Sequence, residues 1–309
     1  MTNTFTAATL EMEKGLPTRR ARATAASVLF NGEFTFSSAA RLQSFAGLLN
    51  EKGNLVGAAV TIGNTLCAQI TARVGFDWVL IDMEHAPVSA REASSLVQAV
   101  VAASGGQCVP VIRTPSHGVE WIKWALDSGA AGIIIPMVTT AQECENIIQR
   151  AIYPPRGQRS FGPFLAPYAD VDPAADVTKY MKERAKEVAI IPMIESMEGV
   201  ENAEAILRVP GVTACFVGPY DLRQSMGLPG GDGEEPSYIN ALQRILEAGK
   251  RNGVVIGTVG ATEASARRKV EMGFRFLLTG QEPNFLAAGA RSTLQQCQRG
   301  MIAARTSNL

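Results

Sequence analysis

The sequence predicts a (β/α)8 barrel preceded by a polar N-terminal extension that includes a helix. Eight short, apolar, β-branched runs occur between residues 54 and 309, and amphipathic stretches with helical spacing separate them. Each run is nearly continuous in apolar residues, as in parallel strands that are buried on both faces. A doubly wound sheet is the alternative. It is disfavoured because no G-x-G-x-x-G follows the first run and no G-x-x-x-x-G-K-[ST] occurs.

The first 50 residues differ from the rest of the chain. They are polar and rich in Ser, Thr and Ala, and only residues 42–49 show apolar positions at helical spacing, before Gly53. We therefore expect a polar arm and a capping helix in residues 1–50 and a catalytic barrel in residues 51–309.

The expected strands follow one another at intervals that leave room for a helix after most of them. In chain order they are residues 55–63, 78–83, 108–113, 131–137, 188–196, 212–219, 253–260 and 274–280. Two connections, 138–187 and 220–252, are long and contain Gly- and Pro-rich segments. Long excursions of this kind in a compact domain are usually functional loops.

Composition excludes several classes of protein. Lys+Arg and Asp+Glu are both 29, hydrophobic residues make up 46 % and charged residues 19 %. Such a chain is not disordered over most of its length, and it lacks the basic excess needed to bind nucleic acid. The sequence has no run of about 18 apolar residues, which excludes a membrane span.

Localisation is expected to be cytoplasmic. The five cysteines are dispersed, without a C-x-x-C, as reduced thiols of an intracellular protein are, and the N-terminus has no apolar signal core. The chain ends in Ser-Asn-Leu, one position away from the peroxisomal address Ser-Lys-Leu, so a peroxisome is the minor alternative.

Charged residues follow four of the eight expected strands. They are Asp82, Glu84, His85, Arg113, Glu195 and Asp221. Catalytic groups of (β/α)8 barrels come from the C-terminal ends of strands, and ionised groups buried there need a partner or a ligand. These residues are therefore the candidates for the active site.

Glu195 and Asp221 follow neighbouring strands, which lie about 4.8 Å apart in a sheet. Two carboxylates this close repel each other unless a cation or a shared proton lies between them. A divalent metal held by both carboxylates, water and substrate oxygens would satisfy them. The alternative is a structural ion pair with Arg113 or Arg223.

Arg113 and His85 each have a functional and a structural interpretation. A guanidinium at a strand end suits a carboxylate or an enolate oxygen, but Arg113 could equally form a salt bridge with Asp82 or Glu84. His85 is a candidate acid/base, although a single His is often a satisfied polar core group. Asp127 could orient an imidazole.

Three absences narrow the reaction class. No Lys stands at an expected strand end, which disfavours a Schiff-base aldolase; no G-x-S-x-G occurs, which disfavours a serine hydrolase; and cofactor glycines are missing. The residues alone thus indicate a metal-dependent barrel enzyme that acts on a small anion.

Six segments in a fixed order resemble the HpcH/HpaI aldolase family, the metal-dependent class II pyruvate aldolases, which also include macrophomate synthase-like relatives. The matching segments are GFDWVLIDMEHAP (75–87), VPVIRTP (109–115), ALDSGAAGIIIPMV (125–138), YPPRGQRSFG (153–162), IPMIESMEG (191–199) and FVGPYDLRQSMG (216–227). The departures Met83, Met193 and Arg223 alter the shape and charge of the expected pocket.

The resemblance implies a role for each candidate residue. Glu195 and Asp221 would bind a divalent cation (Mg²⁺, Mn²⁺ or Co²⁺), and Arg113 would hold the pyruvate or enolate oxygen. His85, oriented by Asp127, would be the acid/base. The remaining expected substrate contacts are Asp82, Glu84, Tyr220 and Tyr180.

The implied reaction is reversible aldol cleavage of a 4-hydroxy-2-oxo acid to pyruvate and an aldehyde, through an enolate held by the metal. Oxaloacetate decarboxylation or macrophomate synthase-like bond formation, a CoA-ester lyase and a non-catalytic binding module are the alternatives. The resemblance also implies a homo-hexamer, a trimer of dimers, with the last helix, within residues 283–304, exchanged between partners.

Overall fold

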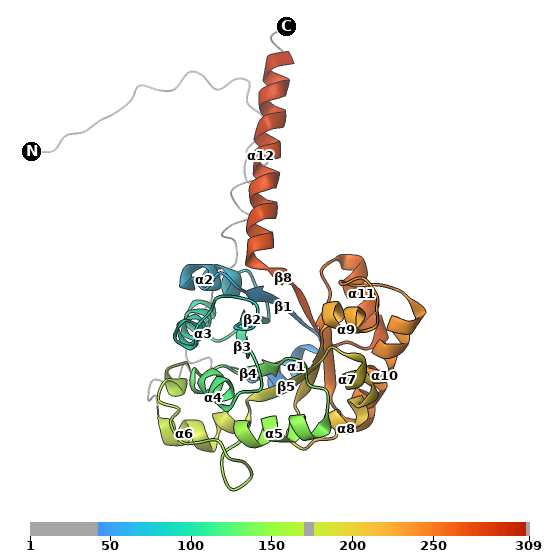
Figure 1. Ribbon diagram of the computed structural model, residues 1–309. Coiled ribbons are helices and arrows are strands. Elements are labelled where there is room, and N and C mark those ends of the chain that lie inside the picture. The colour runs from blue at the N-terminus through green and yellow to red at the C-terminus, as the bar shows by residue number, and fades with distance from the viewer. Residues whose placement is uncertain (1–42, 170–175, 307–309) are drawn as a thin grey trace, which may run out of the picture. The chain divides into compact units, whose positions relative to one another are not determined.

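All eight expected strands are present, and they form a closed parallel barrel in sequence order, β1 to β8 (Figure 1). The computed structural model describes residues 43–169 and 176–306. The predicted fold class is therefore confirmed. The strands are β1 Leu55–Val60, β2 Trp78–Asp82, β3 Val109–Arg113, β4 Gly132–Ile135, β5 Ala189–Ile194, β6 Ala214–Val217, β7 Val255–Val259 and β8 Phe276–Gln281.

Helices separate the strands and cover the outside of the barrel (Figure 1). They are α2 Thr65–Arg73, α3 Ala90–Ser104, α4 Val119–Asp127, α5 Ala141–Ala151, α6 Val177–Lys182, α7 Met197–Glu201, α8 Ala203–Leu207, α9 Pro219–Ser225, α10 Pro236–Asn252 and α11 Glu263–Met272. The last helix, α12 Glu282–Thr306, follows β8 and extends away from the barrel (Figure 1). The connection 138–187 contains α5 and α6 and a non-helical stretch at 152–165, and the connection 220–252 contains α9 and α10. The Gly- and Pro-rich segments of both connections lie largely between these helices.

The helix α1, Phe45–Lys52, closes the barrel core at the end where the strands begin. Ser44 caps its N-terminus, and Gly53 ends it with a φ of 76°. Phe45 is fully buried and makes edge-to-face contacts with Trp78 and Phe276, with ring centroids 6.0 and 5.2 Å apart. Residues 1–42, which include the expected polar arm, lie outside the described residues. All described residues belong to one compact unit, which starts at Ala39.

Apolar side chains form two layers, one inside the barrel and one between the strands and the outer helices. Gly57 shows how tightly the inner layer packs, because a Cβ at this position would lie 2.3 Å from the Trp78 ring. With the inside filled, polar groups are left at the mouth where the strands end. Strand register places Asp82 beside Arg113 there.

The five cysteines are free thiols, as expected from their spacing. Cys108, Cys144 and Cys215 are buried, Cys67 is half-buried, and Cys297 is exposed on α12. Among the described helices, none combines the length and the apolar character needed to cross a bilayer. The three C-terminal residues, which suggested the peroxisomal alternative, lie outside the described residues.

Candidate active site

A cavity of about 660 Å³ opens at the C-terminal ends of the strands. Four of the predicted charged residues line it, together with Tyr220: Asp82, His85, Arg113 and Asp221. Its deeper wall is apolar and includes Leu80, Met193 and Phe216. A concave site with few polar groups at this end of the barrel is where active sites of the fold occur.

Asp82 and Arg113 form a buried ion pair with two parallel hydrogen bonds. The Arg113 Nε donates to Asp82 Oδ1 at 2.9 Å, and Nη2 donates to Oδ2 at 2.7 Å. Burial opposes the charge of Asp82, but the hydrogen bonds and charge of Arg113 hold the pKa of that carboxyl below its usual value. The expected salt bridge is thus present.

The ion pair also shapes the turn that carries the next two candidate residues. The backbone amides of Glu84 and His85 donate to Asp82 Oδ1 at 3.0 and 3.4 Å. Glu84 in turn lies 3.2 Å from Arg113 Nη1. A guanidinium has five N–H donors, and the hydrogen bonds to Asp82 occupy two of those of Arg113. Its other N–H groups form no hydrogen bond within the described residues.

Glu195 follows β5 and is 3 % exposed. Its Oε1 accepts a hydrogen bond of 2.7 Å from the amide of Met137, whose φ of 53° is unusual for a residue with a side chain. Its Oε2 faces Gly218, where a Cβ would lie only 2.3 Å away. Glycine at 218 therefore makes room for this carboxylate.

The pKa of the Glu195 carboxyl is raised in the folded chain. Burial raises the pKa of its carboxyl to about 7; the Met137 amide opposes this, Glu84 and Asp221 add to it, and Arg113 opposes it. Among the described residues, no group of three or more His, Cys, Asp or Glu side chains could hold a metal ion.

A pH dependence of stability follows for the metal-free protein. The folded chain keeps the Glu195 proton up to a pH of about 7, whereas the unfolded chain loses it near 4.5. Between these values the folded state binds more protons, so the free energy of unfolding falls as the pH rises, by about 3 kcal/mol from this group.

Urea denaturation in chelator at pH 5 and pH 8 measures this effect. Glu195→Gln cannot ionise, so we expect it to lose less stability than the unaltered chain between the two pH values. The hydrogen bond from the Met137 amide can persist in this variant, because a glutamine oxygen also accepts. Equal losses in the two proteins would contradict the raised pKa.

His85 and Tyr220 stand at the cavity rim. The His85 side chain is 65 % exposed, and its Nε2 lies 3.6 Å from Glu84 Oε2. Tyr220 is 58 % exposed and lines the cavity beside Asp221. Both side chains are accessible to a ligand in the cavity.

The structure places Asp127 and Tyr180 away from this cavity, around Arg159. The Arg159 Nη2 donates to Asp127 Oδ1 at 2.7 Å, and the Arg159 guanidinium lies 6.0 Å from the centre of the Tyr180 ring. The Tyr180 hydroxyl donates to the carbonyl of Leu126 at 3.3 Å. Asp127 thus pairs with a buried cation instead of with His85 within this chain, a contact that spacing along the sequence cannot reveal.

The other histidine, His117, has a structural role. Its Nε2 lies 2.7 Å from the carbonyl oxygen of Pro136, and its own carbonyl accepts a hydrogen bond from Arg150. It does not line the cavity. His85 is therefore the one histidine at the site.

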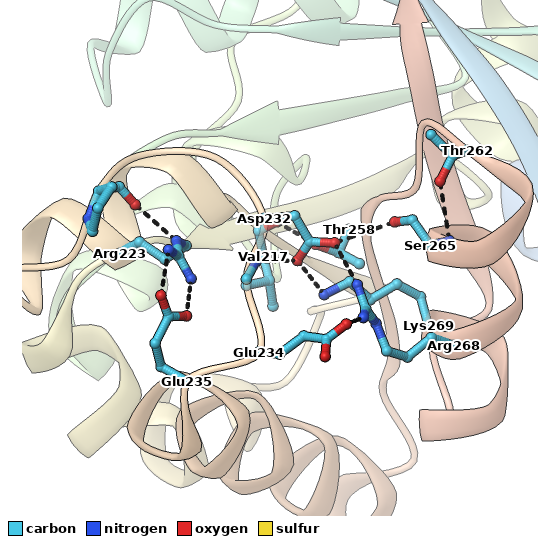
Figure 2. Close-up of polar contacts among 12 residues, drawn as sticks. Val217, Arg223, Asp232, Glu234, Glu235, Thr258, Thr262, Ser265, Arg268 and Lys269 are labelled. Atoms are coloured by element: carbon cyan, nitrogen blue, oxygen red, sulfur yellow. Dashed lines mark hydrogen bonds and ion pairs between the residues drawn. The ribbon is translucent and has the colours of Figure 1, made fainter.

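The loop 228–235 follows α9 and is held by ion pairs (Figure 2). Apart from Arg223, the residues of these ion pairs were not predicted from the sequence. Arg223 forms two hydrogen bonds with Glu235, one of them 2.9 Å long, and donates to the carbonyl of Pro229 at 2.8 Å. Asp232 accepts a hydrogen bond of 2.8 Å from Lys269, which is fully buried. The departure at Arg223 thus pairs with Glu235 instead of with the site carboxylates.

Breaking the Asp232–Lys269 pair is expected to destabilise the protein. Asp232→Ala leaves the buried Lys269 ammonium without its carboxylate, a loss of about 3 kcal/mol in the free energy of unfolding. The double variant Asp232→Ala/Lys269→Met has no buried charge to stabilise and should recover part of this loss. Urea denaturation of both variants tests this, and a double variant less stable than the single one would contradict it.

The family model of the HpcH/HpaI aldolase/citrate lyases matches residues 60–287, which include the whole cavity wall from β2 to β8. The chain belongs to the HpcH/HpaI aldolase/citrate lyase family. The resemblance predicted from six segments is confirmed.

Relatives of this HpcH/HpaI protein support an enzyme. It is 37 % identical to a hydroxypyruvate/pyruvate aldolase of Chromohalobacter salexigens over 74 % of its own length and 87 % of the relative's. It is 32 % identical to 5-keto-4-deoxy-D-glucarate aldolase of Escherichia coli, over 77 % and 90 %. The protein is an aldolase-type lyase, and this decides against a non-catalytic binding module.

Among solved structures, macrophomate synthase is similar over 85 % of this chain and 93 % of its own, with a TM-score of 0.75 and 27 % identity. The expected macrophomate synthase-like relatives are therefore confirmed at the level of structure.

Proposed function

We propose that the protein is a divalent-metal aldolase that cleaves a 4-hydroxy-2-oxo acid to pyruvate and an aldehyde, and catalyses the reverse addition. The observation that carries this proposal is the buried Glu195 carboxylate, which lies among acidic neighbours and beside Arg113. A dication bound by Glu195 and Asp221 would supply the Lewis acidity that stabilises negative charge on a keto oxygen. The aldolase relatives support the same reaction class.

Arg113 would position the 2-oxo acid. Arg113 lines the cavity, and its two hydrogen bonds with Asp82 fix the plane of its guanidinium. Donors held in this way stabilise the oxygen that gains charge as the C3–C4 bond breaks, and they need little reorganisation. Asp82 and Glu84 would act by holding Arg113 in place.

His85 would move the proton. Its imidazole lines the cavity, where it would contact the 4-hydroxyl of a bound substrate. In cleavage it would take the hydroxyl proton, the C3–C4 electron pair would pass to the enolate, and the aldehyde would leave. Protonation of the enolate at C3 would then give pyruvate and restore the proton balance. In this chain Asp127 contacts Arg159, and Tyr180 contacts Leu126. For Asp127 to orient His85, or for Tyr180 to contact the substrate, each residue would need contacts other than these.

The test is a cleavage assay with 4-hydroxy-2-oxo acids, with chelator and with Mg²⁺, Mn²⁺ or Co²⁺ added back. Pyruvate and aldehyde should appear in equal amounts, and only when a metal is present. Cleavage at full rate in chelator would refute the metal, and absence of cleavage with every metal and substrate would refute the aldolase.

Oxaloacetate decarboxylation is a second candidate, because it uses the same enolate and the fold is that of macrophomate synthase. It requires no aldehyde. Pyruvate release from oxaloacetate that exceeds the rate with free metal, and that needs Glu195, would support it.

We also propose that the protein forms a homo-oligomer, which the resemblance predicts to be a hexamer. Large apolar side chains of α12 are exposed, including Phe285, Leu286, Leu294 and Ile302. Helix α12 extends away from the end of β8 (Figure 1). Light scattering of the whole chain would measure the number of subunits.

A further inference from the structure

The helix α9 carries Asp221, one of the two proposed metal ligands, in its first turn. Asp221 lines the cavity and lies close enough to Glu195 to raise the pKa of that carboxyl. The helix has only seven residues, and a helix this short does not hold its position through its own hydrogen bonds. The place of Asp221 relative to Glu195 therefore depends on the contacts that fix α9 to the rest of the fold.

Two contacts fix α9 to the barrel and to the segment that carries Glu195. The Ser225 hydroxyl, at the end of α9, accepts a hydrogen bond of 3.1 Å from the amide of Met197, two positions after Glu195. Leu222 is fully buried in the apolar layer between the strands and the outer helices. The two proposed ligands thus lie on segments that are in contact with each other.

Arg223 fixes α9 to the loop 228–235 (Figure 2). Its side chain is buried and does not line the cavity. All three guanidinium nitrogens donate hydrogen bonds, Nη1 and Nη2 to Glu235 and Nε to the carbonyl of Pro229. The guanidinium also lies 5.1 Å from the centre of the Tyr238 ring, which is fully buried in the first turn of α10. The planar fork of Arg223 thus joins α9 to the loop and to α10 in one geometry.

The loop 228–235 also lies against Tyr220, the residue before Asp221. A Cβ added at Gly230 would lie 3.5 Å from Cδ1 of the Tyr220 ring, and one at Gly231 would lie 3.8 Å from Cε1. Gly231 has a φ of 102°, a conformation that favours glycine. Because the loop backbone packs against Tyr220, a shift of the loop would displace the first turn of α9.

A second anchor holds the loop and does not involve α9. Asp232 accepts a hydrogen bond of 2.8 Å from Lys269, whose ammonium lies 5.4 Å from the centre of the same Tyr238 ring. Glu234 pairs with Arg268, the neighbour of Lys269 on α11 (Figure 2). The loop therefore keeps its attachment to α11 when its contacts with α9 are removed, and the two anchors can be tested separately.

We propose that Arg223 is a positioning residue for the divalent cation: by fixing α9 to the loop and to α10, it holds Asp221 where this carboxylate and Glu195 bind one ion together. This inference rests on the proposed function, because it presupposes the metal. Without Arg223, α9 is expected to sample positions in which Asp221 is displaced. Affinity for the ion then falls in proportion to the population that keeps Asp221 in place.

Arg223→Met is the first test, with Mn²⁺ as the probe and calorimetry of the folded, substrate-free protein as the measurement. We expect the Kd for Mn²⁺ to rise by about tenfold or more, as it does when residues that hold a metal ligand are replaced. At saturating Mn²⁺, kcat for cleavage should return to about half of its original value or more, since Arg223 does not line the cavity. An unchanged Kd together with a lower free energy of unfolding would show that Arg223 serves only the fold, and would overturn the proposal.

Glu235→Gln perturbs the same anchor more mildly. The Glu235 side chain is 38 % exposed, and a glutamine still offers one oxygen to Arg223. We expect its Kd for Mn²⁺ to rise by about threefold, because the hydrogen bond to the guanidinium is no longer charge-assisted on both sides.

Glu234→Gln is the matched control, because it removes the neighbouring carboxylate of the same loop, which pairs with Arg268 and not with α9. Its Kd should equal that of the unaltered chain. Equal Kd values in Glu235→Gln and Glu234→Gln would overturn the proposal, and this comparison decides even where Arg223→Met fails to fold.

Asp77→Ala controls for a general loss of stability. Asp77 precedes β2 at the opposite end of the barrel and accepts hydrogen bonds from Lys52 at 2.6 Å and from the amide of Val56 at 2.8 Å. Its replacement should lower the free energy of unfolding and leave the Kd for Mn²⁺ unchanged. A rise in Kd as large as that of Arg223→Met would mean that metal affinity follows stability in general, which contradicts a specific role of Arg223.

Failure of the proposed metal site has a different signature in the same titrations. If the unaltered chain does not bind Mn²⁺, or if Glu195→Gln binds it as tightly, the proposed function is refuted and this inference with it. If Glu195→Gln loses Mn²⁺ while Arg223→Met keeps the original Kd, this inference alone is refuted.

Discussion

Glu195→Gln is expected to lower kcat/KM for cleavage by about 10³-fold or more, because a neutral amide neither attracts a dication nor holds it next to Asp221. Affinity for Mn²⁺, measured by calorimetry, should fall by about 100-fold or more. Without metal the variant should be at least as stable as the unaltered chain at pH 8, because Glu195 is buried among like charges. Loss of activity would therefore not reflect unfolding.

Two further variants test whether loss of the metal site causes the loss of activity. Asp221→Asn should behave in the same way, since Asp221 is the second proposed ligand. Glu247→Gln removes a carboxylate whose side chain is 71 % exposed on α10 and should change neither activity nor metal affinity. If Glu195→Gln bound Mn²⁺ as tightly as the unaltered chain, the proposed metal site would be wrong.

Arg113→Met is expected to reduce both activity and stability. The loss of donors aimed at the substrate oxygen should cost about 10²- to 10³-fold in kcat/KM. Asp82, which is 3 % exposed, would lose its counter-charge, and the free energy of unfolding should fall by about 3 kcal/mol. Steady-state kinetics and urea denaturation measure the two effects.

The double variant Arg113→Met/Asp82→Asn separates these contributions. With the buried charge also removed, stability should largely recover, while activity should not. Arg113→Lys is a second comparison, because a lysine keeps the charge but cannot form the two parallel hydrogen bonds with Asp82. Full activity in the double variant would show that Arg113 serves only the fold.

Much of the site could be predicted because strand ends are local features of the sequence. Asp82, Arg113 and Asp221 lie directly after or at the end of apolar runs, and a parallel barrel brings all such ends to one mouth. For Arg113 the sequence left open a role in substrate binding or a salt bridge with Asp82 or Glu84. The register of β2 and β3 places Asp82 beside Arg113 and so allows the salt bridge.

The contacts of Asp127 and Tyr180 could not be predicted in this way. Both residues lie on helices, and their neighbour Arg159 comes from a connection whose path depends on packing and not on periodicity. Lys269 is a similar case, because nothing in its local sequence indicates that this lysine is buried against Asp232.

Periodicity and the positions of charges along the chain were sufficient to infer the barrel, its order of strands and the mouth that carries the chemistry, because backbone hydrogen bonding and apolar burial act through neighbouring residues. Burial of Glu195 and the partner that each charged side chain contacts depend on contacts between residues far apart in the chain. Those contacts set the local dielectric and the unused hydrogen bonds, and these quantities determine what a cavity can bind.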